Sequence, residues 1–113
     1  MTAPTFTLAV ETVRIGGTPR TAVSVAGEVD VTNATDFRTA VEGVDGPHPL
    51  IVDLSHLRYL DSAGFAALDQ LLARRAAVIV LDPNSTVHPA AMLAGLPCHP
   101  TVDAAVHAGA APG

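Results

Sequence analysis

The sequence has no lysine and no tryptophan, and aromatic residues make up only 4% of its 113 residues. Its six cationic residues are all arginines, scattered along a chain whose net charge is −5. Proteins that bind nucleic acid need clustered cations for the backbone, and those that bind single strands need several exposed aromatic rings. These absences argue against nucleic acid as a partner.

Cysteine and long apolar runs are also scarce. The single Cys98 cannot close an intramolecular disulfide, which favours a reducing compartment. The longest apolar run, Ala76 to Leu81, is far shorter than the ~20 residues of a membrane-spanning helix. The N-terminus lacks the basic and apolar regions of an export signal. We therefore expect a cytoplasmic protein without a membrane span.

The residues that are present suit a compact domain, since 49% are hydrophobic and 15% are charged. A chain of this length corresponds to one domain of ~100–150 residues. We expect a single domain over residues 1–113, with an ordered core at about residues 5–108 and a flexible tail at residues 109–113.

Hydrophobic periodicity predicts an α/β fold. Alternation over Thr5 to Val13 and Thr21 to Ala26 predicts an antiparallel hairpin that turns at two glycines. Apolar residues at three-to-four-residue steps from Ala34 to Val44 predict a helix capped by Thr32 or Asn33. Later elements are predicted as a buried strand (Leu50 to Leu54), a loop (Ser55 to Leu60), a helix opening at Ser62, a strand (Ala77 to Leu81), a short helix (Pro89 to Leu93), at most an edge strand near Cys98, and a final helix (Val102 to Ala108).

The predicted order is β-β-α-β-α-β-α-(β)-α, a mixed sheet with an antiparallel N-terminal hairpin, later parallel strands and about four helices. In such folds, binding sites lie beyond the carboxyl ends of the parallel strands, where loops enter helices. This rule directs attention to the segment from Asp53 to Gly64.

Within that segment, Ser62 places a hydroxyl at the start of a predicted helix. The free N–H groups and positive dipole end of a helix tolerate negative charge, so a phosphate on Ser62 would leave the helix intact. It would add a charge of about −1.5 to −2 beside Asp61 and repel an acidic or apolar partner. The alternative is that Ser62 only caps the helix. Gly64, which has no side chain, is expected to leave Ser62 accessible to a large partner.

Three segments, in the right order over nearly the whole chain, resemble the STAS-domain family and in particular bacterial anti-sigma factor antagonists. The segment from Leu50 to Gly64 is similar to the family's strand, loop and Asp-Ser-Ser/Ala-Gly motif. Gly27 to Asp30, followed by Thr32 to Ala34, is similar to its Gly-Glu-Leu-Asp loop. Leu93 to Leu96 is similar to its Leu-Ala-Gly-Leu helix end.

The resemblance implies an anti-sigma factor antagonist that acts in transcription regulation and stress response by partner switching, not an enzyme. In that family an anti-sigma factor with serine kinase activity phosphorylates the motif serine of the antagonist, and the phosphorylated antagonist no longer binds it. A serine phosphatase removes the phosphate and restores binding. Ser62 is then the phosphorylation site, no cofactor or metal is needed, and the protein is a monomer or weak dimer. The implied partner-binding residues are Asp30, Asn33, Asp61, Ser62, Ala63, Gly64 and Phe65.

An alternative within the same family is a STAS subunit of a transporter or signalling assembly, in which Ser62 is structural and never phosphorylated. The chain departs from the family pattern at Phe65, where leucine is usual, and in the thin segment around Cys98. The second departure affects only the edge of the predicted sheet.

Other chemistry has weaker support in the sequence. Ser62 lacks the first glycine of the Gly-x-Ser-x-Gly motif of hydrolases. Asp30, Asp53 and Asp61 could form the magnesium pocket of a phospho-aspartate receiver, but that class needs a lysine; we expect Asp53 to accept hydrogen bonds from nearby N–H groups instead. Cys98 is redox-active only if it is exposed, and a buried small hydrophobe is favoured. Metal-ligand spacing is absent among His48, His56, His88, His99 and His107.

Overall fold

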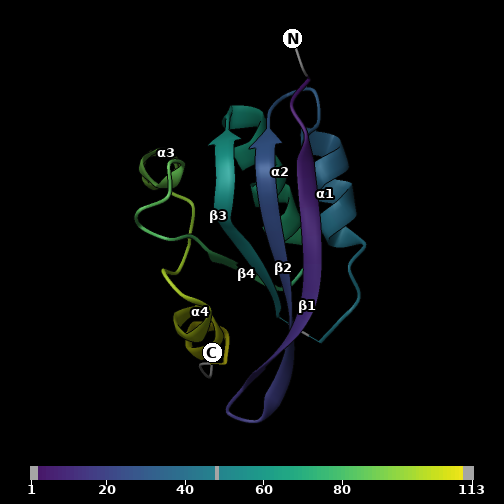
Figure 1. The fold of residues 1–113 in the computed structure, drawn as a ribbon, viewed down its shortest axis with the longest axis vertical. Coiled ribbons are helices and arrows are strands. Elements are labelled where there is room, and N and C mark those ends of the chain that lie inside the picture. Colours follow the sequence, from purple (N-terminus) through teal and green to yellow (C-terminus); the bar gives the residue numbers. More distant parts are fainter. Residues whose placement is uncertain (1–2, 48, 111–113) are drawn as a thin grey trace.

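The protein is described by a computed structural model that covers residues 3–47 and 49–110, without the side chains of residues 107–110. Four strands form one mixed sheet in the order β1-β2-β3-β4 (Figure 1). The predicted α/β fold and element order are confirmed. The elements are β1 (Phe6–Ile15), β2 (Thr18–Val29), α1 (Ala34–Glu42), β3 (Leu50–Leu60), α2 (Ser62–Arg74), β4 (Ala77–Val80), α3 (His88–Ala94) and α4 (Val102–Ala110).

The N-terminal hairpin is the antiparallel part of the sheet. β1 pairs with β2 from Phe6 opposite Gly27 to Ile15 opposite Thr18. Gly16 and Gly17 form the turn with φ of 59° and 81°, a left-handed conformation that glycine adopts without steric cost. β2 then pairs in parallel with β3, and β3 pairs in parallel with β4.

The main core lies between the sheet and the helix pair α1 and α2, which cover one of its faces (Figure 1). The apolar stripe of each helix points to the sheet, as the three-to-four-residue spacing predicts. The ring of Phe6 on β1 meets the ring of Phe37 on α1 edge to face, with 5.8 Å between their centroids. The largest fully buried side chains include Phe37, Leu50, Ile51, Leu54, Leu57, Leu68 and Leu71.

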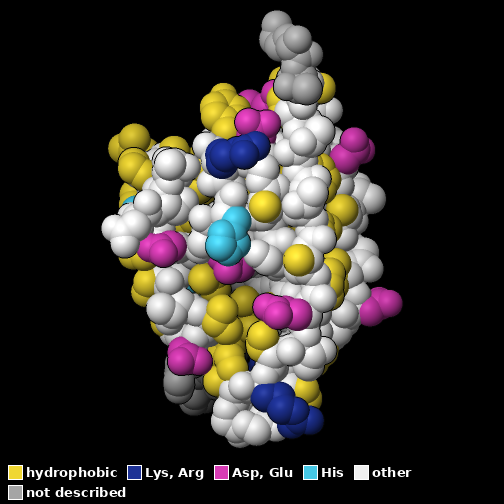
Figure 2. Space-filling model, in the orientation of Figure 1, with side chains coloured by type: hydrophobic (Ala, Val, Ile, Leu, Met, Phe, Trp, Pro, Cys, Tyr) yellow, Lys and Arg dark blue, Asp and Glu magenta, His cyan; other side chains and the backbone are white. Residues whose placement is uncertain are grey.

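The opposite face of the sheet is only partly covered. α4 packs there through Ala105 and Val106, against Ile51 of β3 and Val80 of β4. Figure 2 shows that the sheet face in view carries mostly small or polar side chains with scattered charges. A shallow hollow of about 270 Å³ lies there, lined by Thr5, Thr7, Ala26, Gly27, His56 and Arg58.

β3 is longer than the sequence indicated. The segment from Ser55 to Leu60, predicted as a loop, continues the strand as far as Leu60. Two irregularities in the pairing with β2, between Ser24 and Ala26 and between Gly27 and Glu28, each give β3 an extra residue. Such bulges break strict alternation, which explains why this part of the strand does not show a period of two.

The C-terminal third matches the predicted elements with small shifts. α3 ends at Ala94 and is followed by Gly95, whose φ of 71° closes the helix in the left-handed conformation. The predicted edge strand is a single parallel bridge between Val80 and His99. α4 extends to Ala110, so residues 109 and 110, expected in a flexible tail, are helical, while residues 111–113 lie outside the described residues. Within the described ranges, no helix is long and apolar enough to cross a membrane.

Candidate functional site

The loop after β2 and the start of α2 lie next to each other at the carboxyl ends of parallel strands. Val29 pairs with Leu60, the last residues of β2 and β3, and the Asp61 N–H donates to the Val29 carbonyl at 3.3 Å. This register brings together two segments that are about thirty residues apart in sequence, which begin at Asp30 and Asp61. The rule for parallel sheets had pointed to this edge.

Ser62 is the first residue of α2, and its side chain is exposed. The helix is capped by Asp61, whose Oδ1 accepts a hydrogen bond from the Gly64 N–H at 3.1 Å. The alternative role of Ser62 as the helix cap is therefore wrong. No described residue binds the Ser62 hydroxyl, because the preceding aspartate supplies the cap that serine often provides. The hydroxyl is thus available to an enzyme or a partner from solvent.

Gly64 has a different role from the one expected. It is buried on the inner side of the first turn of α2, not beside the Ser62 hydroxyl. A Cβ at this position would overlap the Leu60 side chain and approach Val29 Cγ1 to 3.3 Å. The missing side chain therefore lets the start of α2 sit close against the ends of β2 and β3, which fixes the position of Ser62.

The loop from Asp30 to Asn33 is held by its own polar side chains. Asp30 Oδ1 accepts from the Thr32 N–H at 2.8 Å, and Asn33 Oδ1 accepts from the Asp30 N–H at 2.9 Å. Asn33 Nδ2 donates to the carbonyls of Glu28 and Pro4. Asn33 precedes α1, but its side chain makes no capping bond; the Asp30 carbonyl accepts from the Ala34 N–H instead. Asn33 thus shapes the loop from within.

Val31, at the tip of this loop, was not among the predicted partner-binding residues. Its side chain is 76% exposed, although it is apolar, because the hydrogen bonds of Asp30 and Asn33 turn it outward. An apolar residue between polar loop residues was the available signal. Val31 lies at one end of a groove of about 200 Å³ between α1 and α2, whose walls are mostly small side chains: Ala34, Thr35, Arg38, Ala63, Ala66, Ala67 and Gln70.

Of the predicted partner-binding residues, Ser62 is exposed and Asp30, Asp61 and Ala63 are half-buried at the same edge. Phe65 is half-buried and packs against the main core. Gly64 and Asn33 hold the two segments of this surface in place through the contacts described above. The exposed part of the candidate surface therefore consists of Val31, Ser62 and the groove between α1 and α2.

The remaining candidate residues have structural surroundings. Asp53 Oδ1 accepts from the Ser55 N–H at 2.9 Å, as expected for this aspartate. Cys98 is half-buried against the core, and burial raises the pKa of its thiol, so the unreactive protonated form prevails at neutral pH. In the part of the chain that the structure describes, no three His, Cys, Asp or Glu residues are placed to hold a metal ion. His48 and the side chain of His107 lie outside that part.

Comparison with known proteins gives the family. The family model described as "Mlab, STAS domain" matches residues 14–96, which include both the Asp30 loop and the Ser62 turn. The chain belongs to the STAS-domain family. No curated protein sequence matches this STAS domain closely enough to add to that result.

Solved structures that resemble this STAS domain include two antagonists. The crystal structure of an anti-sigma factor antagonist from Mycobacterium paratuberculosis is 28% identical, with a TM-score of 0.69 over 96% of this chain and 98% of that one. An antisigma-factor antagonist STAS domain from Rhodobacter sphaeroides is 19% identical, with a TM-score of 0.46 over 64% of this chain and 82% of that one. The mycobacterial protein shares the fold over almost its full length.

Proposed function

We propose that this STAS domain is an anti-sigma factor antagonist that binds an anti-sigma factor with serine kinase activity and so releases a sigma factor. The observation that carries the proposal is the Ser62 hydroxyl, which is exposed at the first turn of α2 and bound by no described residue. The likeness to the mycobacterial antagonist supports the same role. The protein acts by binding in the cytoplasm, with no catalytic site or cofactor of its own.

The binding surface consists of Val31, Ser62 and the groove between α1 and α2. Val31 is an apolar side chain that a partner would remove from water, which favours association. The small residues of the groove allow a side chain of the partner to approach both helices. Asp61 and the internally bonded Asp30 loop hold this surface in one conformation before binding, which lowers the entropy lost on association.

Phosphorylation of Ser62 switches this surface off. The phosphate adds a charge of about −1.5 to −2 at the centre of the surface, close to the carboxylate of Asp61. The N-terminus of α2 tolerates the added charge, so the fold remains intact. The partner, however, would have to bury an unpaired charge, which typically costs 2–5 kcal/mol of binding free energy. A serine phosphatase restores the binding form.

The test compares Ser62→Ala with Ser62→Asp as immobilised baits in lysate of the protein's own cells. We expect the alanine variant to retain a protein kinase that phosphorylates Ser62 of the wild-type chain when ATP is added. The aspartate variant should bind the same purified kinase at least about thirtyfold more weakly. Thr12→Asp, which adds the same charge on exposed β1, should bind like the wild type. Equal affinity of the alanine and aspartate variants for the kinase would contradict the switch.

A second candidate is a permanent STAS subunit of a transporter or signalling assembly. The side chains of Met92 and Leu93 on α3 are 52% and 92% exposed, and hydrophobic side chains gather over this helix at the left edge of Figure 2. Exposed apolar groups of this kind favour a lasting contact away from Ser62. Stoichiometric purification with a transporter ATPase, together with an unmodified Ser62, would favour this candidate.

A further inference from the structure

Half of the cationic residues of this acidic chain meet at Glu42, two of them at its carboxylate and one at its backbone carbonyl. Arg38 Nη1 lies 3.2 Å from Glu42 Oε1, and Arg74 Nη1 lies 4.0 Å from the same oxygen. Arg75 Nη1 donates to the Glu42 backbone carbonyl at 3.0 Å. Three guanidinium charges against one carboxylate leave two positive charges here, while the chain as a whole carries −5. The scattered arginines of the sequence thus form a cationic cluster at the C-terminal ends of α1 and α2.

The cluster keeps many hydrogen-bond donors unused. A guanidinium has five N–H donors in a planar fork. The side chain of Arg74 is 63% exposed, and its contact with Glu42 is at the outer limit of an ion pair. Arg75 uses one donor on the Glu42 carbonyl, and its buried Nε has no acceptor among the described residues. One shared carboxylate oxygen cannot accept hydrogen bonds from all of these N–H donors. A ligand that supplied further acceptor oxygens would therefore bind favourably here.

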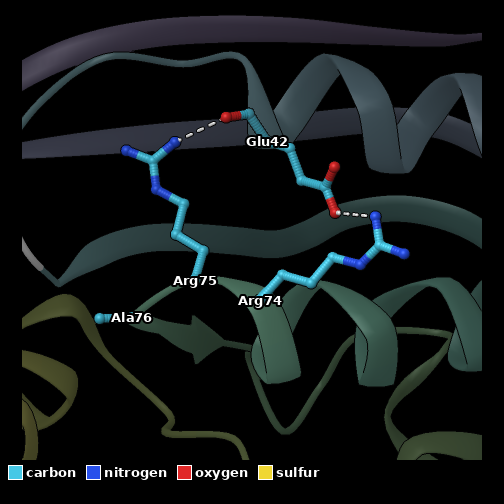
Figure 3. Close-up of a pocket in the computed structure, with 4 residues that line it drawn as sticks. All are labelled: Glu42, Arg74, Arg75 and Ala76. Carbon is cyan, nitrogen blue, oxygen red and sulfur yellow. Dashed lines mark hydrogen bonds and ion pairs between the residues drawn. The ribbon is translucent and has the colours of Figure 1, made fainter.

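A surface pocket that is open to solvent, called the cavity below, lies beside Arg74, Arg75 and Glu42. Its volume is about 510 Å³, and it is lined by Glu42, Arg74, Arg75 and Ala76. Figure 3 shows both arginine side chains reaching from the end of α2 toward Glu42 on α1, with the carbonyl bonded on one side and the carboxylate on the other. This volume lies within the ~300–1,000 Å³ of typical small-molecule sites.

We propose that this cavity binds a phosphate dianion, either free or as the phosphate monoester of a small molecule. Planar guanidinium forks match the geometry of phosphate oxygens and bind them through paired, charge-assisted hydrogen bonds. A phosphate monoester carries about −1.5 to −2 at neutral pH and is opposite in sign to the formal charge of +2 on Arg38, Arg74, Arg75 and Glu42, of which the negative dipole ends of α1 and α2 offset a part.

The cavity is at the opposite end of α2 from Ser62, and its lining residues do not line the groove of the surface proposed for the kinase; Arg38, which pairs with Glu42, does line that groove. The inference therefore does not depend on phosphorylation of Ser62. The ligand would add contacts between α1 and α2, the two helices that also form the groove of the candidate surface.

Titration calorimetry of the full chain tests the site with inorganic phosphate, ribose 5-phosphate and ribose. We expect saturable binding of at least one phosphate compound with a Kd of about 1 mM or tighter, and none of ribose. Equal affinity for the two phosphate compounds would identify free phosphate as sufficient. Tighter binding of ribose 5-phosphate would show that the organic part also contacts the cavity. Absence of saturable binding for both would overturn the proposal.

Three variants locate the binding. Arg74→Gln should weaken phosphate binding about tenfold, because it removes an exposed guanidinium from the cavity. Glu42→Gln should strengthen binding severalfold, because it removes the competing carboxylate; a purely structural role of Glu42 predicts no such gain. Arg58→Gln, which removes an exposed arginine paired with Glu28 outside the cluster, should leave the affinity unchanged. An equal loss in Arg58→Gln and Arg74→Gln, or weaker binding by Glu42→Gln, would contradict the site.

Discussion

The two ends of α2 differ in how their polar groups are used. At the N-terminal end, Asp61 caps the helix and leaves the adjacent Ser62 hydroxyl free in solvent. At the C-terminal end, Arg74 and Arg75 reach across to Glu42 on the neighbouring helix. Acid at the start and cations at the end both suit the helix dipole. The difference is that the polar side chain at the first end bonds within the same turn, whereas the arginines at the second end bond to Glu42 of α1.

The N-terminal end of α2 is therefore a rigid turn, whereas the C-terminal end has hydrogen-bond donors available to a ligand. The turn that holds Ser62 is fixed by Gly64, Leu60 and Asp61, so the hydroxyl has a defined position although it makes no bond itself. The arginine end joins two helices but keeps donors to spare. A modification at the first end changes the outer surface, and a ligand at the second would change how α1 and α2 are joined.

The largest expected effect comes from filling the space at Gly64. Gly64→Val places a branched side chain against Leu60 and Val29, which should lower the free energy of unfolding by about 2 kcal/mol. Ala73→Val, at an exposed position near the other end of α2, is the matched control. Urea denaturation measures both. Equal loss in the two variants would show that the N-terminal end is not tightly packed and that the comparison fails.

Val31→Ser tests whether the loop beside Ser62 is a binding surface. Since Val31 is mostly exposed, the free energy of unfolding should change by less than about 0.5 kcal/mol. Affinity for the kinase should fall about tenfold, because one apolar side chain no longer leaves water on binding. Val10→Ser removes the same apolar side chain from an exposed position of β1, where the valine is 55% exposed, and should not alter the affinity. Unchanged affinity in both variants would exclude Val31 from the interface.

Asp61→Ala tests whether Asp61, and not the adjacent Ser62, stabilises the start of α2. Loss of the bond to the Gly64 N–H should lower the free energy of unfolding by about 1 kcal/mol. Ser62→Ala and Asp69→Ala, the latter exposed in the middle of α2, should each change it by less than about 0.5 kcal/mol. Thermal or urea unfolding decides between them. A cost of Ser62→Ala as large as that of Asp61→Ala would mean that the hydroxyl is committed to the helix.

The smallest single effect on stability is expected at the arginine end, from Arg74. Arg75→Gln should cost about 1 kcal/mol of unfolding free energy, since it removes a half-buried bond to the Glu42 carbonyl. Arg74→Gln should cost less than about 0.5 kcal/mol, because its ion pair is long and exposed to solvent. High salt should remove the Arg74 effect and retain the Arg75 effect. The reverse ranking would contradict the assignment of Arg75 as the residue that joins α1 to α2.

The sequence predicted the fold and the position of the Ser62 turn because both follow from local patterns. Alternation marked the hairpin, and the three-to-four-residue spacing marked α1 and α2. The rule that binding sites lie at the carboxyl ends of parallel strands directed attention to the segment from Asp53 to Gly64. The family resemblance, and not this rule, added the Asp30 loop. The extension of β3 from Ser55 to Leu60 could not be predicted in this way, because two bulges disturb the alternation.

Features that depend on tertiary contacts were not predictable. Gly64 was expected to expose Ser62. A glycine is needed there because a side chain would overlap Leu60, and only the packing of α2 on the sheet reveals this contact. Arg38 is more than thirty residues away from Arg74 and Arg75 in sequence; the contact between α1 and α2 gathers all three at Glu42. Charge spacing along one chain does not show such a cluster.

The most direct test of the proposed switch is the intact mass of the protein purified from its own cells, with and without stress, followed by peptide mapping around Ser62. We predict a phosphate on Ser62 whose occupancy changes with stress, since the proposed kinase and phosphatase would act on this exposed hydroxyl. An unmodified Ser62 under every condition would contradict the switch and favour the permanent-subunit alternative.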